Sequence, residues 1–597
     1  MLKPQQTRTR ELQNLDGIWD FKVDHEDLGF SQNWAAKRLD TKLDIAVPSS
    51  YNDLFTDVAI REHVGWVWYQ RLVRVPRGWV NDRIFVRLGA ATHHGVVLVN
   101  GNQVAEHVGG YTPFEAEITD LVEAGEEFLL TIAVSNMLTN ETIPPGKVVT
   151  RDNGAKQQTY LHDFFNYSGL ARSVVLHSTP KTAVTDVTVV TDFEGSTGFV
   201  NYEVELSAQA ELTAKLFDEA GHLVATGVGL KGKLTVEDVK LWEPGNAYLY
   251  QLVLEVSTAG SVVDEYKLSV GVRTVQVSGN QFLINKKPFY FTGFGMHEDH
   301  VVKGKGHDNS FLVNDFELLK WVGANSFRTS HYPYAEEVMD YADRHGIVVI
   351  DETAAVGINQ SFAGVFGGPK LPTFGPETAN EKTQAALLQA IRELIARDKN
   401  HPCVVMWSVT NEPETGLDEA AEFFKPAFDL VRELDPTRPH TYINVMMDPF
   451  DKCKVAPLAD VICLNRYWGW YEDHADLENA QLHLEREIEG WTTKYNVPII
   501  FTEYGADTIS GAHSIHNLPW SEEYQVEYLR ANHRGFDKFP GVVGEHVWNF
   551  ADFQTKPGVL RVLGNKKGVF TRDRQPKAAA FELRSRWTKL NNQKPKH

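Results

Sequence analysis

The chain has 597 residues, of which 42% are hydrophobic and 23% charged, an ordinary composition for a globular protein that excludes wholesale disorder. Lysine and arginine total 59 and aspartate and glutamate total 79, so the formal net charge is −20. This acidity argues against a nucleic-acid or acidic-membrane partner, and it means that an anionic substrate needs a local basic group. At about 100–200 residues per domain, the length predicts three to five domains, or fewer if one is a large barrel.

The first 181 residues are predicted to form a β-sandwich or jelly roll. The run Gly65–Pro76 is strand-like, and Val96–His107 contains Asn100-Gly101 between two apolar stretches. Because Asn and Gly tolerate a positive φ, this dipeptide indicates a tight hairpin. Many short strands with little helical periodicity are typical of an all-β domain.

Residues 182–273 are predicted to form an immunoglobulin-like β-sandwich. Tyr202, Val204 and Leu206 alternate with glutamates, as in a strand that buries one face. The segment lacks the Cys…Trp…Cys signature of antibody domains, so this prediction rests on the strand pattern alone.

Residues 274–597 change to apolar strand-like runs that alternate with helical patterns, which indicates a parallel sheet buried on both faces. Eight strands are expected, beginning near residues 289, 326, 347, 404, 441, 461, 498 and 542. Eight such units in this length favour a (β/α)₈ barrel, in which the active site lies at the carboxyl ends of the strands.

Polar residues cluster at those predicted strand ends: Asp351-Glu352, Asn411-Glu412, Asn465-Arg466-Tyr467, Glu503-Tyr504 and Trp548-Asn549. Two carboxylates at one barrel mouth suggest glycoside hydrolysis, in which one carboxyl donates a proton and the other attacks the anomeric carbon or activates water. The separation of the two carboxyl groups decides between retention and inversion, and the sequence does not give it. Nearby aromatic residues could stack on a sugar or simply pack in the barrel.

Several strand-end residues have simpler interpretations. Glu352 and Glu545 are expected to be surface residues or members of a salt bridge. His297 and His331 match no trusted metal-binding spacing, so no metal site is predicted. Asp163 lies outside the barrel, and on spacing alone it is a loop residue.

The cysteines and the N-terminus predict a cytoplasmic protein. Cys403, Cys453 and Cys463 form no C-x-x-C pair and cannot make a complete disulfide set, which favours reduced thiols. Residues 1–10 are polar and lack the apolar segment of a secretion signal. No apolar run reaches the length of about 18 residues that indicates a membrane span.

Longer motifs carry a family resemblance along nearly the full chain. They are "GGYTPFEAEIT" (109–119), "HDFFNYSG" (162–169), "FLINKKPFYFTGFG" (282–295), "GANSFRTSHYPYAEE" (323–337), "VVMWSVTNEP" (404–413), "FTEYGADT" (501–508), "VWNFADF" (547–553) and "NKKGVFTRDRQPK" (565–577). On these motifs the chain resembles the bacterial β-glucuronidases of glycoside hydrolase family 2. The resemblance implies a sugar-binding-like jelly roll, an immunoglobulin-like sandwich and a catalytic barrel.

The resemblance also implies roles for the strand-end residues. Glu412 in "NEP" would be the acid/base and Glu503 in "TEYG" the nucleophile of a retaining hydrolase. Asn411 would hydrogen-bond the sugar 2-hydroxyl, and Tyr467 would orient the nucleophile. Asn465, Tyr471 and Trp548 are the further expected substrate contacts.

Substrate choice depends on "NKK", in which Asn565 and Lys567 would hold the carboxylate of a glucuronide. An ammonium is a strong donor to a carboxylate, and it would offset the repulsion from an acidic chain. Arg561 is a second candidate for this clamp, and Asp163 would reach a sugar hydroxyl from the first domain. Outside this family context, the same tripeptide would be interpreted as a basic surface turn.

Alternatives remain for the substrate and the class of protein. A related glycosidase acting on galactosides, mannosides or galacturonides is the nearest, and the clamp argues against neutral sugars but not against galacturonides. A non-catalytic carbohydrate-binding protein or a structural scaffold is disfavoured because both carboxylates are present. The resemblance implies a homotetramer with no cofactor. It also implies that the loop 357–379 leans over the aglycone.

Overall fold

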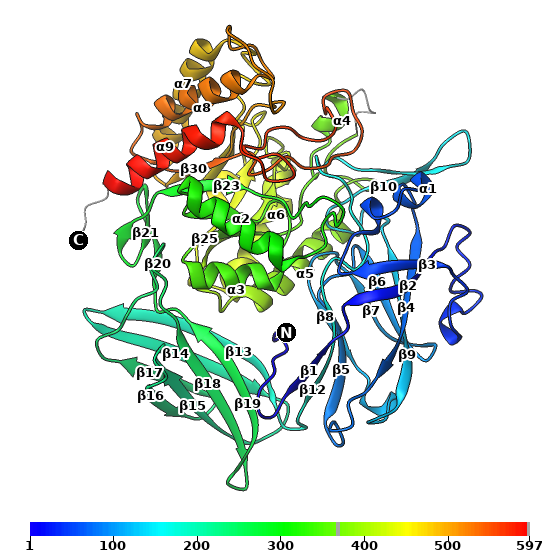
Figure 1. The fold of residues 1–597 in the computed structure, drawn as a ribbon. Helices are drawn as coiled ribbons and strands as arrows, with labels where there is room; N and C mark the ends of the chain where they lie inside the picture. The colour runs from blue at the N-terminus through cyan, green and yellow to red at the C-terminus, as the bar shows by residue number, and fades with distance from the viewer. Residues whose placement is uncertain (366–370, 594–597) are drawn as a thin grey trace.

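A computed structural model of the protein describes residues 1–365 and 371–593. Figure 1 shows three parts: a β-rich N-terminal domain in blue and cyan, a second β-domain in green, and a larger α/β part that both of them touch. The predicted architecture of jelly roll, immunoglobulin-like sandwich and barrel is confirmed. No helix in the described ranges is long and apolar enough to cross a membrane.

The N-terminal domain is a sandwich of a six-stranded and a four-stranded antiparallel sheet. The first sheet runs β3(Leu43–Val47), β2(Gly17–Val23), β4(Trp66–Arg74), β9(Glu127–Ser135), β6(His94–Val99) and β7(Asn102–Val108), and the second runs β1(Glu11–Asn14), β12(Val174–Thr179), β5(Arg83–Leu88) and β8(Phe114–Glu117). The predicted hairpin is confirmed, because Asn100 and Gly101 both have positive φ, 50° and 84°, between β6 and β7. A short helix, α1(Val58–Arg61), and a two-stranded ribbon, β10(Lys147–Thr150) with β11(Lys156–Thr159), lie outside these sheets.

The second domain packs a three-stranded sheet on a four-stranded sheet. The strands are β13(Val184–Glu194), β14(Thr197–Leu206) and β17(Lys231–Val236), then β16(Leu223–Val228), β15(Glu211–Phe217), β18(Tyr250–Thr258) and β19(Ser261–Val270). The predicted alternation holds on β14, where Tyr202 and Val204 are buried and the glutamates between and after them are exposed. Two of the three expected apolar positions are fully buried, and Leu206 at the strand end is half-buried.

The barrel closes through eight parallel strands. They are β23(Phe291–Gly295), β24(Ser326–Arg328), β25(Val348–Glu352), β26(Val404–Asn411), β27(His440–Asn444), β28(Ile462–Asn465), β29(Ile499–Glu503) and β30(Val542–Val547). Every strand residue is buried, because helices cover the outer face and side chains fill the interior. The hairpin β20(Val275–Ser278), β21(Gln281–Ile284) and β22(Lys287–Pro288) precedes the first barrel strand.

Helices surround the barrel and follow its strands in the chain. They are α2(Asn309–Val322), α3(Glu336–His345), α4(Ser361–Val365), α5(Glu381–Asp398), α6(Asp418–Leu434), α7(Leu477–Lys494), α8(Glu522–Phe536) and α9(Ala578–Gln593). Helix α4 belongs to the predicted loop 357–379, of which residues 366–370 lie outside the described part of the chain.

The three parts share one buried apolar cluster. Tyr111 and Phe164 from the first domain and Trp242 from the second join the side chains of the barrel core. The two β-domains are therefore packed against the barrel rather than tethered to it. We propose domain boundaries at 1–181, 182–273 and 274–597, since β12 and β19 end just before them.

Candidate active site

Glu503 ends β29, and two donors hold its carboxylate, one from a strand across the barrel and one that follows the adjacent strand β28. Arg328, at the end of β24, donates from one Nη to Oε1 at 2.5 Å, and the Tyr467 hydroxyl donates to Oε2 at 2.6 Å. The residue is only 4% exposed. Both carboxylate oxygens are thus fixed before any substrate arrives, as an attacking group requires.

Arg328 also binds a second buried carboxylate, that of Glu352. Its other Nη donates to both oxygens at 2.8 and 2.9 Å, the Ser408 hydroxyl donates at 2.7 Å, and His331 Nδ1 lies at 3.0 Å. Burial raises the pKa of Glu352, but Arg328 and His331 outweigh it and hold that pKa below its usual value. The expected structural ion pair of Glu352 is confirmed, and Glu545 has a similar one with Arg586 at 2.7 Å.

Glu412 follows β26 and has a left-handed backbone, with φ at +48°. Such a conformation costs about 1–3 kcal/mol for a non-glycine residue, and it persists only where neighbours impose it. Its backbone N–H donates to the Ile443 carbonyl at 2.9 Å, and the Asn359 side chain donates to its carbonyl at 3.2 Å. The strand end therefore turns the Glu412 side chain toward the barrel mouth.

The Glu412 carboxyl is built to hold a proton. Desolvation first, and then the negative charge of Glu503, raise its pKa from 4.5 to about 8, against the opposing effect of a hydrogen bond from Asn465. That bond joins Asn465 Nδ2 to Glu412 Oε1 at 3.0 Å. A raised pKa on one carboxyl of a pair is the arrangement that separates acid and base roles.

The amides at the strand ends join the two carboxylates into one site. Asn465 Nδ2 also lies 3.4 Å from Asn411 Oδ1, and Arg328 donates to that same oxygen at 3.4 Å. The Thr502 hydroxyl donates to Asn465 Oδ1 at 3.0 Å, which fixes the orientation of this amide. Asn411 therefore lies beside both Glu412 and the group that holds Glu503.

Trp548 forms an apolar wall of the same mouth. Its ring stacks on His331 at a centroid distance of 5.0 Å and meets Phe553 edge-on at 5.6 Å. It is 4% exposed, so most of its surface serves barrel packing. The packing interpretation therefore applies to Trp548, and a contact with a sugar stays a prediction.

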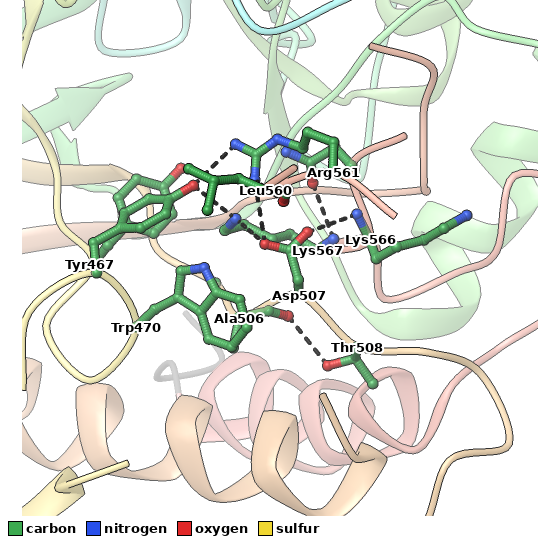
Figure 2. A network of polar contacts seen from close by, with 12 residues as sticks. Tyr467, Trp470, Ala506, Asp507, Thr508, Leu560, Arg561, Lys566 and Lys567 are labelled. Carbon is green, nitrogen blue, oxygen red and sulfur yellow. Dashed lines mark hydrogen bonds and ion pairs between the residues drawn. The ribbon is translucent and has the colours of Figure 1, made fainter. Parts of the chain in front are cut away.

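Lys567 is almost fully buried beside this mouth, and Figure 2 shows its ammonium between Asp507 and the tyrosines. It forms a close ion pair with Asp507 and donates to the Tyr471 hydroxyl at 3.0 Å. The ammonium also lies 4.8 Å from the ring centre of Tyr471 and 5.3 Å from that of Trp470. A lysine in these surroundings is not the surface turn that its tripeptide alone would suggest.

Arg561 and Asp163 link the first domain to the barrel mouth. Arg561 donates from Nε and Nη2 to the Asp163 carboxylate at 2.6–3.0 Å, and from Nη2 to the Tyr471 hydroxyl at 3.0 Å. Asn565 Nδ2 donates to the same carboxylate at 3.1 Å, and its Oδ1 accepts from the Lys567 backbone N–H at 3.0 Å. Asp163 is therefore brought into the predicted site, where it pairs with the basic clamp.

Two residues of this site were not among the residues predicted from sequence. Arg328 lies at a predicted strand end and inside the motif 323–337, but neither sign assigned it a role, and its importance comes from the two carboxylates that it binds. Asp507 lies four residues after Glu503 in the motif 501–508, which was the available sign for it. Its partnership with Lys567 depends on the fold.

Within the described residues, one group could hold a metal ion: Asp343, His401 and Cys403. It lies at the amino ends of the strands, opposite the mouth. Asp343 accepts from the Cys403 backbone N–H at 2.9 Å and pairs with His401 at 2.6 Å. Hydrogen bonds and an ion pair within the group already occupy the Asp343 carboxylate. The group is not part of the candidate site.

Family models match three consecutive segments of the chain. The sugar binding domain of glycosyl hydrolases family 2 matches residues 12–180, a further model described as glycosyl hydrolases family 2 matches 174–273, and the TIM barrel domain matches 275–592. A protein of Paenibacillus borealis named beta-glucuronidase is 49% identical over 597 residues, covering 99% of each chain.

Solved structures agree over the full length. An uncultured Clostridium sp. beta-glucuronidase has a TM-score of 0.93 at 45% identity, covering 99% of this chain and 100% of its own. A Ruminococcus gnavus β-glucuronidase in complex with D-glucaro 1,5-lactone has a TM-score of 0.93 at 41% identity, covering 98% of this chain and 99% of its own. With its three segments matched in order, the chain belongs to glycosyl hydrolase family 2.

Proposed function

We propose that the chain hydrolyses β-D-glucuronides with retention of configuration, with Glu412 as acid/base and Glu503 as nucleophile. The observation that carries this proposal is that the two carboxyl groups at the barrel mouth have different surroundings. Glu412 has a pKa raised to about 8, while Glu503 accepts hydrogen bonds on both oxygens from Arg328 and Tyr467. Relatives named beta-glucuronidase over the full length support the substrate class.

In the first step, a Glu503 oxygen attacks the anomeric carbon while Glu412 gives its proton to the glycosidic oxygen. The bond to the aglycone breaks, an alcohol leaves, and the sugar is esterified to Glu503. Loss of the Glu503 charge removes the repulsion that held the proton on Glu412, so the pKa of Glu412 falls. In the second step, Glu412 takes a proton from water, the water oxygen attacks the anomeric carbon, and Glu503 is released with glucuronate.

The sugar would be held by the amides and the basic clamp. Asn411 lies beside Glu412, where a bond to the sugar 2-hydroxyl would strengthen as the ring gains positive charge. The sugar carboxylate would enter between Arg561 and Lys567. Asp163 pairs with Arg561, and the Asp163 side chain is 44% exposed, so this carboxylate can move to a sugar hydroxyl at small cost. The Asp507 side chain is only 1% exposed and stays paired with Lys567.

The acid role of Glu412 predicts the alkaline side of the pH profile. Because the protonated carboxyl is required for the first step, kcat/KM should fall as the pH rises through about 8. Glu412→Gln should remove this limb and lower kcat/KM by about 10²–10⁴-fold on an alkyl glucuronide, and by less on a nitrophenyl glucuronide, whose leaving group needs little protonation.

The matched control is Glu419→Gln, an exposed carboxyl on the following helix α6, which should keep the wild-type profile. Steady-state kinetics between pH 5 and about 10 on both substrates measure these effects. An unchanged alkaline limb in Glu412→Gln would assign the proton donor to another residue.

The clamp predicts substrate choice. Lys567→Ala should lower kcat/KM on a nitrophenyl β-glucuronide by roughly 10- to 150-fold, the equivalent of one charge-assisted hydrogen bond of about 1.5–3 kcal/mol. The same variant should change turnover of the matching β-glucoside far less, because that sugar has no carboxylate. Lys566→Ala removes the neighbouring ammonium, which lies 3.7 Å from Asp552, and serves as the control.

The measurement is the ratio of kcat/KM for glucuronide, galacturonide and glucoside in each variant. A ratio that Lys567→Ala leaves at the wild-type value would remove the basis of the glucuronide proposal. A wild-type preference for galacturonide would reassign the substrate and leave the two-carboxylate mechanism in place.

We further propose that the enzyme is a cytoplasmic homotetramer. The family resemblance supports the assembly, and three buried cysteines without a disulfide support a reducing compartment. Light scattering during size-exclusion chromatography should give four times the chain mass of 67.3 kDa, and a peak at the mass of one chain would contradict the assembly.

A further inference from the structure

A second polar cavity lies at the junction of the second domain and the barrel. It has a volume of about 280 Å³, and its walls include Val190, Asn201, Arg273, Thr274, Asn400 and Arg438. These residues come from the second domain, from the linker after β19, and from the loops before β26 and β27. Figure 1 shows this junction at the end of the barrel where α3 and β20 approach the sandwich.

The cavity is separate from the site of hydrolysis. Asn400 lies just before the start of β26, and Arg438 lies just before the start of β27. Both residues are therefore at the amino ends of barrel strands. The catalytic carboxylates lie at the opposite, carboxyl ends. A ligand in this cavity would therefore contact neither Glu412 nor Glu503.

Arg273 brings a buried positive charge to the cavity wall. The residue is 6% exposed, and its Nε and Nη2 donate to the carbonyls of Pro402 and Val404, both at 2.7 Å. Among the residues that the structure describes, it forms no ion pair, and its Nη1 makes no hydrogen bond. Burying a guanidinium without an anion is costly, so this position favours a negative partner.

A second guanidinium increases the positive potential at this wall. Arg438 Nε donates at 2.7 Å to the same Val404 carbonyl that Arg273 uses, so the two cations share one acceptor. Asp435 pairs with Arg438 at 2.7 Å and neutralises one of the two charges. The remaining acid of the wall, Asp192, is an exposed residue on β13, so one positive charge stays uncompensated inside.

The adjacent Thr274 does not add a donor to this wall. Its Oγ1 makes no hydrogen bond within the described structure, but it is buried with almost no accessible surface, so a ligand in the cavity would not contact it. Arg273 Nη1 is therefore the free donor that this stretch of the chain offers to the cavity.

We propose that this cavity binds a small oxyanion, a short carboxylate or a phosphate, that joins the second domain to the barrel. The guanidinium supplies charge and a directed donor, which carboxylate and phosphate oxygens accept equally well. The volume lies just under the range of about 300–1,000 Å³ that is typical of ligand pockets, so a compact anion fits and a nucleotide does not. Because the anion would contact both domains, binding should stabilise their junction.

The test uses the full-length protein with acetate and inorganic phosphate as separate probes. Each is titrated at constant ionic strength against sodium chloride while the melting temperature is followed. A saturable rise with one probe is expected, and the probe that acts identifies carboxylate or phosphate as the ligand. The titration is repeated in Lys567→Ala, which lacks the active-site cation and should keep the response.

Arg273→Lys is the decisive variant, because it keeps the positive charge and removes the directed free donor of the guanidinium. It should weaken the apparent affinity by roughly 10- to 150-fold, the effect of one charge-assisted hydrogen bond. Thr235→Val, an exposed threonine of the same sandwich on β17, should leave it unchanged. Arg273→Gln should abolish the response, and if that variant does not fold, Arg273→Lys alone is the test.

Three results would overturn the proposal. They are a response that does not saturate with either probe, an affinity that is the same in Arg273→Lys and the wild type, and a response that disappears in Lys567→Ala. The last would assign all anion binding to the active-site clamp. It would leave the proposed hydrolysis untouched, so failure of this inference is distinguishable from failure of the proposed function.

Discussion

The Arg328 guanidinium has no exposed surface and binds two carboxylates, Glu352 and Glu503. A buried cation is tolerated only where anions and further hydrogen bonds compensate its desolvation, and here Glu352 supplies most of that compensation. The second Nη of Arg328 donates to Glu503 and fixes its position. The negative charge of Glu503 in turn helps to raise the pKa of Glu412. One buried ion network thus sets both the position of the Glu503 carboxylate and the protonation of Glu412.

The other two domains meet the barrel at different ends. The first domain reaches the candidate site directly, because Asp163 binds Arg561, which lies 398 residues later in the chain. The second domain meets the barrel at its opposite end, where Arg273 and Arg438 line a polar cavity. One apolar cluster includes side chains of all three parts, and the docking of the first domain brings Asp163 to Arg561 and Asn565.

The sequence predicted the barrel strands to within two residues of their observed starts, since a strand buried on both faces is a continuous apolar run. It also identified Glu412 and Glu503 through their positions at strand ends and through family motifs. The roles of Arg328 and Asp507 were not predicted, because they depend on partners that only the closed barrel brings near. The pairing of Asp163 with Arg561 was also not predicted from the sequence, because no local pattern connects residues so distant in the chain.

In the mechanism that we propose, Glu503, oriented by Arg328 and Tyr467, forms the covalent bond to the sugar. That bond can be trapped with a 2-deoxy-2-fluoro-glucuronyl fluoride, and digestion of the protein with tandem mass spectrometry then locates the added mass. One label per chain is expected, on Glu503, with faster release of the label when an acceptor alcohol is added. A label on another carboxylate, or hydrolysis with inversion and no label, would rule out this role of Glu503.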